Sequence, residues 1–190
     1  MLGGTMTDAN GNVNANFTVP ADYPAGLRLV TVGSVGTALT ADCSVDVEGA
    51  PAVAVAVPVD VNPTSCPNPF NVGKQGTIPV AILGTSTFDV TRIDPTSIRL
   101  EGISATRFTY SDVATPYTPF IGKVGSNACT QAGPDGFTDL SLSFDASLVA
   151  ATLPAVSNNE TFTLHLTGNS LPQFGGAPIA GEDVVVIKTK

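Results

Sequence analysis

Short segments in which apolar and polar residues alternate recur along the chain, and this pattern restricts the fold more than any other feature. In residues 13–19, for example, Val13, Phe17 and Val19 share one face, while Asn and Thr residues occupy the other. Alternation with a period of two is the pattern of a β-strand with one buried face. The chain is also rich in Thr, Ser, Gly and Pro, and only 13% of its residues are charged, which disfavours long exposed helices. The sequence therefore predicts an all-β protein.

The alternating segments fall into two groups that meet near residue 50. About three strands are expected upstream, at the spacing of about 8–12 residues that is typical of β-sandwiches. They cover residues 12–19, 26–33 and 37–47. About seven more are expected downstream, in residues 53–61, 76–84, 97–102, 106–113, 137–145, 160–168 and 182–188. We therefore predict two parts, residues 1–49 and residues 50–190.

Several local signals refine this prediction. Asp94 and Asp145 precede short helical patterns as N-caps. Pro79 interrupts an apolar strand, which predicts an edge strand or a bulge, since proline cannot donate to a ladder. Residues 113–134 form a long loop rich in Pro and Gly. Loops of this length are usually functional or held in place by specific contacts.

Charge and hydropathy exclude several partners. The formal net charge is −8 and the basic residues are scattered, whereas nucleic-acid binding requires clustered Lys and Arg. No segment has the ~20 apolar residues that a membrane-spanning helix needs. The start, "MLGGTM", lacks the basic and apolar regions of a signal peptide, which favours a mature chain or an excised fragment. An acidic, Lys-poor composition of this kind is common in secreted proteins.

The three cysteines lie in different contexts. Cys66 and Cys129 are in loop-like segments rich in Pro and Gly, where a disulfide would brace weak structure. Cys43 shares an alternating face with Val45 and Val47, as a small buried apolar residue would. We therefore favour a Cys66–Cys129 disulfide, with Cys43 left over.

Most of residues 59–188 resembles a β-sandwich module that recurs in secreted and cell-surface proteins of bacteria and archaea. The resemblance lies in "VDVNPTSCPNPFNVGKQGTIPVAILGTSTFDVTRIDPTSIRLEG", "YSDVATP", "GPDGFTDLSLSFD" and "LHLTGNSLPQFGGAPIAGEDVVVI". The first part is similar to the last strands of bacterial immunoglobulin-like surface domains, through "TDANGNVNANFTVP" and "AGLRLVTVGS". These resemblances imply immunoglobulin-like β-sandwich modules with long loops, at an extracellular location and without a catalytic role.

In relatives of the second module, the loop before the "DLSLSFD"-like strand is often a compact run of Asp and Gly that resembles calcium loops. Carried onto this chain, the resemblance implies ligands from the side chains of Asp112, Asp135 and Asp139 and from the carbonyl of Phe137. The long insertion between Asp112 and Asp135 departs from the compact form.

The residues alone support two interpretations of this loop. Asp135-Gly136-Phe137-Thr138-Asp139 offers two carboxylates with a carbonyl between them, and calcium prefers such oxygen ligands. Asp135 could equally accept backbone hydrogen bonds in a tight turn without any metal. Calcium is therefore one of two expectations at this site.

The remaining polar residues indicate little chemistry. Asp42, Asp46 and Glu48 share one strand face and are interpreted as solvated, and Glu182 and Asp183 as charges that protect a strand edge. His165 shares its strand face with threonines and is interpreted as exposed. Neither a nucleophile elbow nor zinc-ligand spacing occurs, and a chain without Trp has few aromatic sugar platforms.

These observations favour a non-catalytic extracellular structural protein. It would be a surface or filament subunit that self-associates through β-strand contacts, because about three strands in the first part cannot bury their own apolar face. The alternative is a ligand- or glycan-binding accessory module of a larger secreted enzyme or adhesin.

Overall fold

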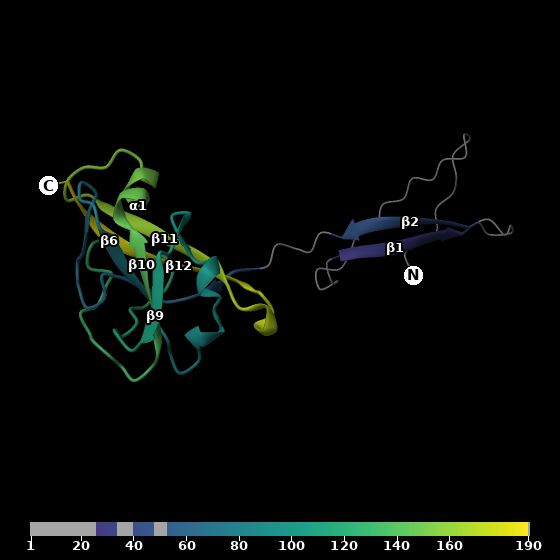
Figure 1. Cartoon of the computed structure of the whole chain (residues 1–190), viewed down its shortest axis with the longest axis horizontal. Coiled ribbons are helices and arrows are strands. Elements are labelled where there is room, and N and C mark those ends of the chain that lie inside the picture. The colour runs from purple at the N-terminus through teal and green to yellow at the C-terminus, as the bar shows by residue number, and fades with distance from the viewer. Residues whose placement is uncertain (1–25, 34–39, 48–52, 190) are drawn as a thin grey trace. The chain divides into compact units, whose positions relative to one another are not determined.

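The computed structural model describes residues 26–33, 40–47 and 53–189, which form two units, Met1–Ala52 and Val53–Lys190 (Figure 1). In the first unit, β1 (Gly26–Gly33) and β2 (Thr40–Val47) pair antiparallel along their whole length. Cys43 lies in β2 opposite Val30. The strand expected in residues 12–19 lies outside the described residues.

The described strands of the second unit form two sheets. One sheet is antiparallel, with the order β4-β6-β10-β9. The other has the order β3-β12-β11-β7-β8, and β5 adds to it by pairing in parallel with β12. The strands of the first sheet are β4 (Val59–Val61), β6 (Thr77–Ile82), β9 (Arg107–Ser111) and β10 (Asp139–Asp145). Those of the second are β3 (Val55–Ala56), β5 (Asn68–Asn71), β7 (Arg99–Leu100), β8 (Ile103–Ser104), β11 (Thr161–Asn169) and β12 (Pro178–Lys188).

The helical pieces begin where the sequence predicted. The α-helix α1 (Ala146–Thr152) follows β10, and the Asp145 carboxylate accepts hydrogen bonds from the first backbone N–H groups of the helix. Asp94 caps the 3₁₀ helix Pro95–Ser97 in the same way. Two further 3₁₀ turns cover Val90–Arg92 and Pro172–Phe174.

The alternating pattern accounts for the core between the two sheets. Leu140, Leu142 and Phe144 of β10 are buried, together with Leu164 and Leu166 of β11. The polar residues between them point away from this core, as the period of a strand requires. The expected all-β class is therefore confirmed at the level of two packed sheets.

Pro58 divides the segment expected as a strand in residues 53–61. Before it, β3 pairs with β12, and after it, β4 pairs with β6, so the chain crosses from one sheet to the other. All three residues of β4 are buried. Val59 and Val61 join the core between the sheets, whereas the alternation of the strand turns Asp60 to the opposite face.

The outer face of the β4-β6-β10-β9 sheet is also covered. Ala81, which pairs with Asp60, packs there with Leu83 and Ala114. Ala114 belongs to the connection between β9 and β10, residues 112–138, which we call the covering loop. The covering loop therefore buries charged side chains on this face.

Pro79 is a correction to the sequence prediction, because β6 lies between β4 and β10 and is an inner strand. β4 ends at Val61, and the N–H of Asn62 donates the next hydrogen bond to the Pro79 carbonyl. Proline is tolerated because the ladder with β4 ends at this position.

Among the described residues, no helix is long and apolar enough to span a membrane.

Candidate functional site

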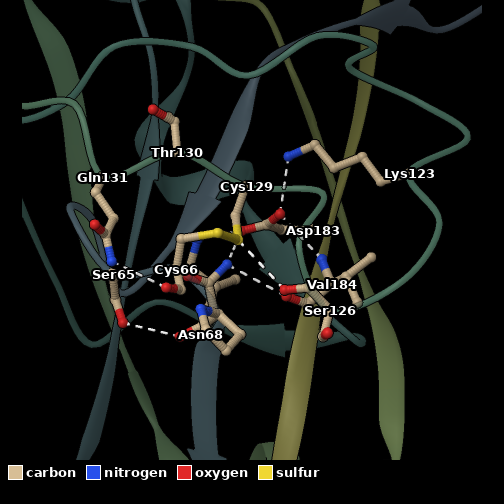
Figure 2. Close-up of a disulfide and its surroundings, with 12 residues drawn as sticks. Ser65, Cys66, Asn68, Lys123, Ser126, Cys129, Thr130, Gln131, Asp183 and Val184 are labelled. Carbon is tan, nitrogen blue, oxygen red and sulfur yellow. Dashed lines mark hydrogen bonds and ion pairs between the residues drawn. A yellow bond between two sulfur atoms is a disulfide. The ribbon is translucent and has the colours of Figure 1, made fainter.

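The covering loop is joined covalently to the segment between β4 and β5. Cys66 and Cys129 form a disulfide, the pair that the sequence favoured, across 63 residues of chain and with their Cα atoms 5.5 Å apart (Figure 2). The Gln131 side chain adds a hydrogen bond of 3.0 Å to the Cys66 carbonyl. The disulfide therefore fixes the middle of the loop against the sandwich.

A buried ion pair lies close to the disulfide. Nζ of Lys123, from the covering loop, is 2.9 Å from Oδ1 of Asp183 in β12 (Figure 2). The side chains are 2% and 1% exposed. The Lys123 ammonium also donates to the Val59 carbonyl at 2.7 Å. A pair this deeply buried requires such additional hydrogen bonds, because both charges have lost their water.

Asp183 connects three strands as well as the loop. Its Oδ2 accepts hydrogen bonds from the backbone N–H of Val61 at 2.7 Å and from the Asn68 amide at 2.8 Å. Its Oδ1 also accepts one from the Val184 N–H at 3.0 Å. Burial raises the pKa of Asp183, while the Lys123 charge and the hydrogen bonds from Val61, Lys123 and Val184 oppose the shift. The carboxylate thus joins β12 to β4 and β5 at the edge where the two sheets meet.

Glu182 holds the backbone of the same loop. Its Oε1 accepts hydrogen bonds from the N–H groups of Gly122 at 2.6 Å and Lys123 at 2.8 Å. The interpretation of Glu182 and Asp183 as edge charges is wrong, because both are buried and β12 has strand partners on both sides.

Asp60 is buried beside this network without a hydrogen bond of its own. It is 5% exposed, and neither carboxylate oxygen has a hydrogen-bond partner among the residues that the structure describes. Burial and the charge of Asp183 raise the pKa of Asp60 to about 7, although Lys123 opposes the shift. The Thr64 backbone also opposes the shift, although its distance and angle to Asp60 are not those of a hydrogen bond. A carboxyl group in this environment keeps its proton up to a higher pH than a carboxyl group in water.

The expected calcium residues lie at the two ends of the covering loop. Asp112 accepts hydrogen bonds from the N–H groups of Asp135 at 3.0 Å and Gly136 at 2.7 Å, which closes the neck of the loop. Asp135 in turn accepts one from the Phe137 N–H at 3.1 Å. The structure therefore brings Asp112, Asp135 and Phe137 together through backbone hydrogen bonds.

Asp139 has a different environment and is fully buried. Its Oδ1 accepts a hydrogen bond from the Gly84 N–H at 2.8 Å, and its Oδ2 accepts from Val113 at 2.7 Å and Ala114 at 3.2 Å. Burial raises the pKa of Asp139, and these three hydrogen bonds oppose the shift. The carboxylate is thus occupied in holding the start of the covering loop.

These contacts agree with the interpretation in which the carboxylates accept backbone hydrogen bonds in a tight turn without a metal. The carboxylates of Asp112, Asp135 and Asp139 each accept hydrogen bonds from backbone N–H groups, and a calcium ion would compete for the same lone pairs. Within the described ranges, no group of three or more His, Cys, Asp or Glu side chains could hold a metal ion. The donor set does not fit calcium as it stands, and calcium binding stays a prediction.

The histidine that the sequence placed on an exposed face lies there. The His165 side chain on β11 is 62% exposed, and its Nδ1 is 3.1 Å from Oε1 of Glu101. The backbone N–H of His165 also donates a hydrogen bond to the same Glu101 oxygen, at 2.6 Å.

Comparisons of the chain with protein-family models, with curated proteins and with solved structures found no match. The resemblances of both parts to extracellular modules therefore remain expectations from the sequence.

Sequence reasoning missed the residues of the buried network. Asp60, Lys123 and Asp183 were not selected because charged residues are usually assigned to the solvent face of a strand. A signal existed in "EDVVVIK", where two acidic residues lead directly into an apolar run without alternation. Such runs are typical of strands that are buried on both faces.

Proposed function

We propose that this chain is a non-catalytic extracellular structural protein, a surface or filament subunit that assembles with copies of itself through β-strand contacts. In this proposal the first unit is the end of an immunoglobulin-like domain, and the second is a durable β-sandwich. The observation that carries the proposal is the exposed edge strand β9.

β9 presents a partly uncovered apolar face. Phe108 and Tyr110 lie opposite Leu142 and Leu140 of β10, so they share the core-side face of the sheet. Leu142 and Leu140 are buried, whereas Phe108 is 46% and Tyr110 is 40% exposed. Among the described strands, β9 is also the last of its sheet and pairs only with β10. An edge strand with exposed aromatic side chains is a template for pairing with another chain.

The buried polar groups support a structural role. Asp139, Glu182 and Asp183 are at most 9% exposed, and their carboxylates hold the covering loop. Side chains so deeply buried stabilise the fold and do not meet a substrate. The Cys66–Cys129 disulfide fits an oxidising, extracellular compartment.

Assembly is tested on the full chain by light scattering after size exclusion and by negative-stain microscopy. We expect polymers, and we expect a Phe108→Lys/Tyr110→Lys variant to remain monomeric with an unchanged circular dichroism spectrum, because charges on an edge strand oppose pairing. The control is Val124→Lys, since Val124 is 87% exposed but lies in the covering loop. A native chain that is monomeric at all concentrations would contradict the proposal.

A surface hollow favours the alternative function, an accessory module that binds a ligand or glycan. Its volume is about 390 Å³, and it is lined by residues that include Phe88, Asp89, Arg92 and Phe174. The Arg92 guanidinium lies 5.1 Å from the centroid of the Phe174 ring. A monomer that binds on a glycan array, and loses binding in an Arg92→Ala/Phe174→Ala variant, would establish this function instead.

A further inference from the structure

A primary amine and a carboxyl group meet in the interior of the second unit. Lys123 Nζ and Asp183 Oδ1 are 2.9 Å apart, and their side chains are 2% and 1% exposed. A second carboxyl group, that of Asp60, lies in β4 between Val59, whose carbonyl accepts a hydrogen bond from Lys123, and Val61, whose N–H donates to Asp183. An amine, a carboxyl group and an adjacent acid, all of them buried, are the components of amide formation.

We propose that Lys123 and Asp183 condense to form an intramolecular isopeptide bond, with Asp60 as the assisting acid and base. The new bond joins Nζ of Lys123 to Cγ of Asp183, and one water molecule leaves. This inference does not depend on the proposed function.

The geometry holds the reacting groups in place. The carboxyl carbon of Asp183 lies one covalent bond beyond the oxygen that contacts Nζ at 2.9 Å, and bond formation needs Nζ to approach this carbon to ~3–3.5 Å. Hydrogen bonds from Val61, Asn68 and Val184 fix the carboxyl group. The Val59 carbonyl fixes the amine from another side, at 2.7 Å. Fixed orientation of this kind replaces the entropy loss of a bimolecular reaction.

The reactive form needs only the protons already present. Transfer of one proton along the Nζ–Oδ1 hydrogen bond converts the ammonium and carboxylate into a neutral amine and a carboxylic acid. Burial raises the pKa of the Asp183 carboxyl group and so favours its neutral, protonated form. The neutral amine has the lone pair that attacks the carbonyl carbon.

Asp60 accounts for the remaining proton transfers. Within the described part of the chain, both of its oxygens are free of hydrogen-bond partners, and it is 5% exposed. In its protonated form it donates a proton to the departing hydroxyl oxygen, and it then accepts the surplus proton from the nitrogen. One C–O bond breaks, one C–N bond forms, water is released, and Asp60 returns to its starting state. Positioned acids and bases typically accelerate such steps by ~10²–10⁴-fold.

Asn68 supplies a competing outcome that can be distinguished by mass. Its amide donates to Asp183 at 2.8 Å, and its Oδ1 has no partner. Attack of Lys123 on Asn68 would release ammonia, whereas attack on Asp183 releases water. The two products also connect different peptides.

The test is the intact mass of the full chain after denaturation and reduction of the disulfide. We expect a deficit of one water molecule, a tryptic peptide pair joined through Lys123 and Asp183, and faster migration on a denaturing gel. The native chain alone can overturn the proposal, because an unmodified mass, or a deficit of ammonia, excludes the Lys123–Asp183 amide.

Variants test the assigned roles. Lys123→Arg and Asp183→Ala should each restore the full calculated mass, and the control Lys74→Arg, at an exposed position, should retain the deficit. Asp60→Asn keeps the reacting pair and should be isolated largely without the link, since it lacks the acid. An Asp60→Asn chain that is fully linked at isolation would overturn the role of Asp60.

Discussion

The backbone N–H of Lys123 lies 2.8 Å from Oε1 of Glu182, while the Lys123 side chain contacts Asp183, the next residue of β12. Two consecutive residues of one strand therefore bind the same loop residue at its two ends. The first contact fixes the path of the covering loop, and the second closes the edge of the sandwich where β4 meets β12. The two contacts can be separated by substitution.

Glu182→Ala should loosen the covering loop without disturbing the Lys123–Asp183 contact. It leaves the N–H groups of Gly122 and Lys123 without their acceptor, and the N–H of Lys123 is buried, where an unsatisfied donor costs about 1–3 kcal/mol. We expect faster amide hydrogen exchange at these two residues and a free energy of unfolding lower by about 2 kcal/mol. Glu182→Gln keeps an acceptor oxygen and should lose much less. Equal exchange in the Ala variant and the native chain would contradict the assigned role.

Asp60 should make the protein less stable as the pH rises from about 4 to about 7. The pKa of Asp60 is raised from 3.8 to about 7, so the native state keeps a proton that the unfolded state has already released. Stability therefore falls across this range and is constant above it. Burial is the largest cause of the shift, and it persists whether or not the neighbouring pair condenses.

Asp60→Asn should consequently lose this pH dependence, so that between about pH 4 and about pH 7 its free energy of unfolding rises relative to that of the native chain by up to about 4 kcal/mol, at the conversion of about 1.4 kcal/mol for each pKa unit. Urea denaturation at a series of pH values measures this. Part of the slope should remain, because burial also raises the pKa values of Asp139 and Asp183. Asp135→Asn, at an exposed position, is the matched control. A stability difference between native chain and Asp60→Asn that does not change with pH would refute the assigned pKa shift.

Alternation predicted much of the sandwich, because one buried face leaves a clear pattern. Leu140, Leu142 and Phe144 were assigned to one strand face from the sequence, and all three are buried. The N-caps Asp94 and Asp145 were also correct, because capping depends on residues that are close in sequence.

The buried network could not be predicted in the same way. Asp60 and Asp183 lie on strands whose second face is covered by a loop or a neighbouring strand, and such coverage depends on tertiary structure. The parallel pairing of β5 with β12 was missed for a related reason. Its residues, Asn68–Asn71, contain a proline and are too few to show a period.

The Cys66–Cys129 disulfide should contribute substantially to stability. It closes a loop of 63 residues, for which the chain-entropy relation gives about 4 kcal/mol. A Cys66→Ser/Cys129→Ser variant should lose about this amount in denaturant titrations. Reducing agent should bring the native chain to the same level and leave the variant unchanged. If reduction left the free energy of unfolding of the native chain unchanged, the other contacts would hold the covering loop without the disulfide.

Asp139→Ala separates the two interpretations of the Asp112–Asp139 region. The substitution leaves the N–H groups of Gly84, Val113 and Ala114 without an acceptor in a buried position, so we expect a loss of about 3 kcal/mol or more. If the carboxylate acts only as a backbone acceptor, thermal unfolding should show the same loss in millimolar calcium and in excess chelator.

The matched variant for this experiment is Asp135→Ala, because Asp135 is exposed and holds a single backbone N–H, that of Phe137. It should cost less than about 1 kcal/mol under both conditions. Calcium gives the opposite pattern, since an ion that binds only the native state raises its unfolding temperature. Calcium would then raise the unfolding temperature of the native chain, and it would raise that of neither variant. Calorimetric titration of the native chain measures the binding itself, and heat that disappears in Asp135→Ala would show that the loop takes up calcium despite its backbone hydrogen bonds.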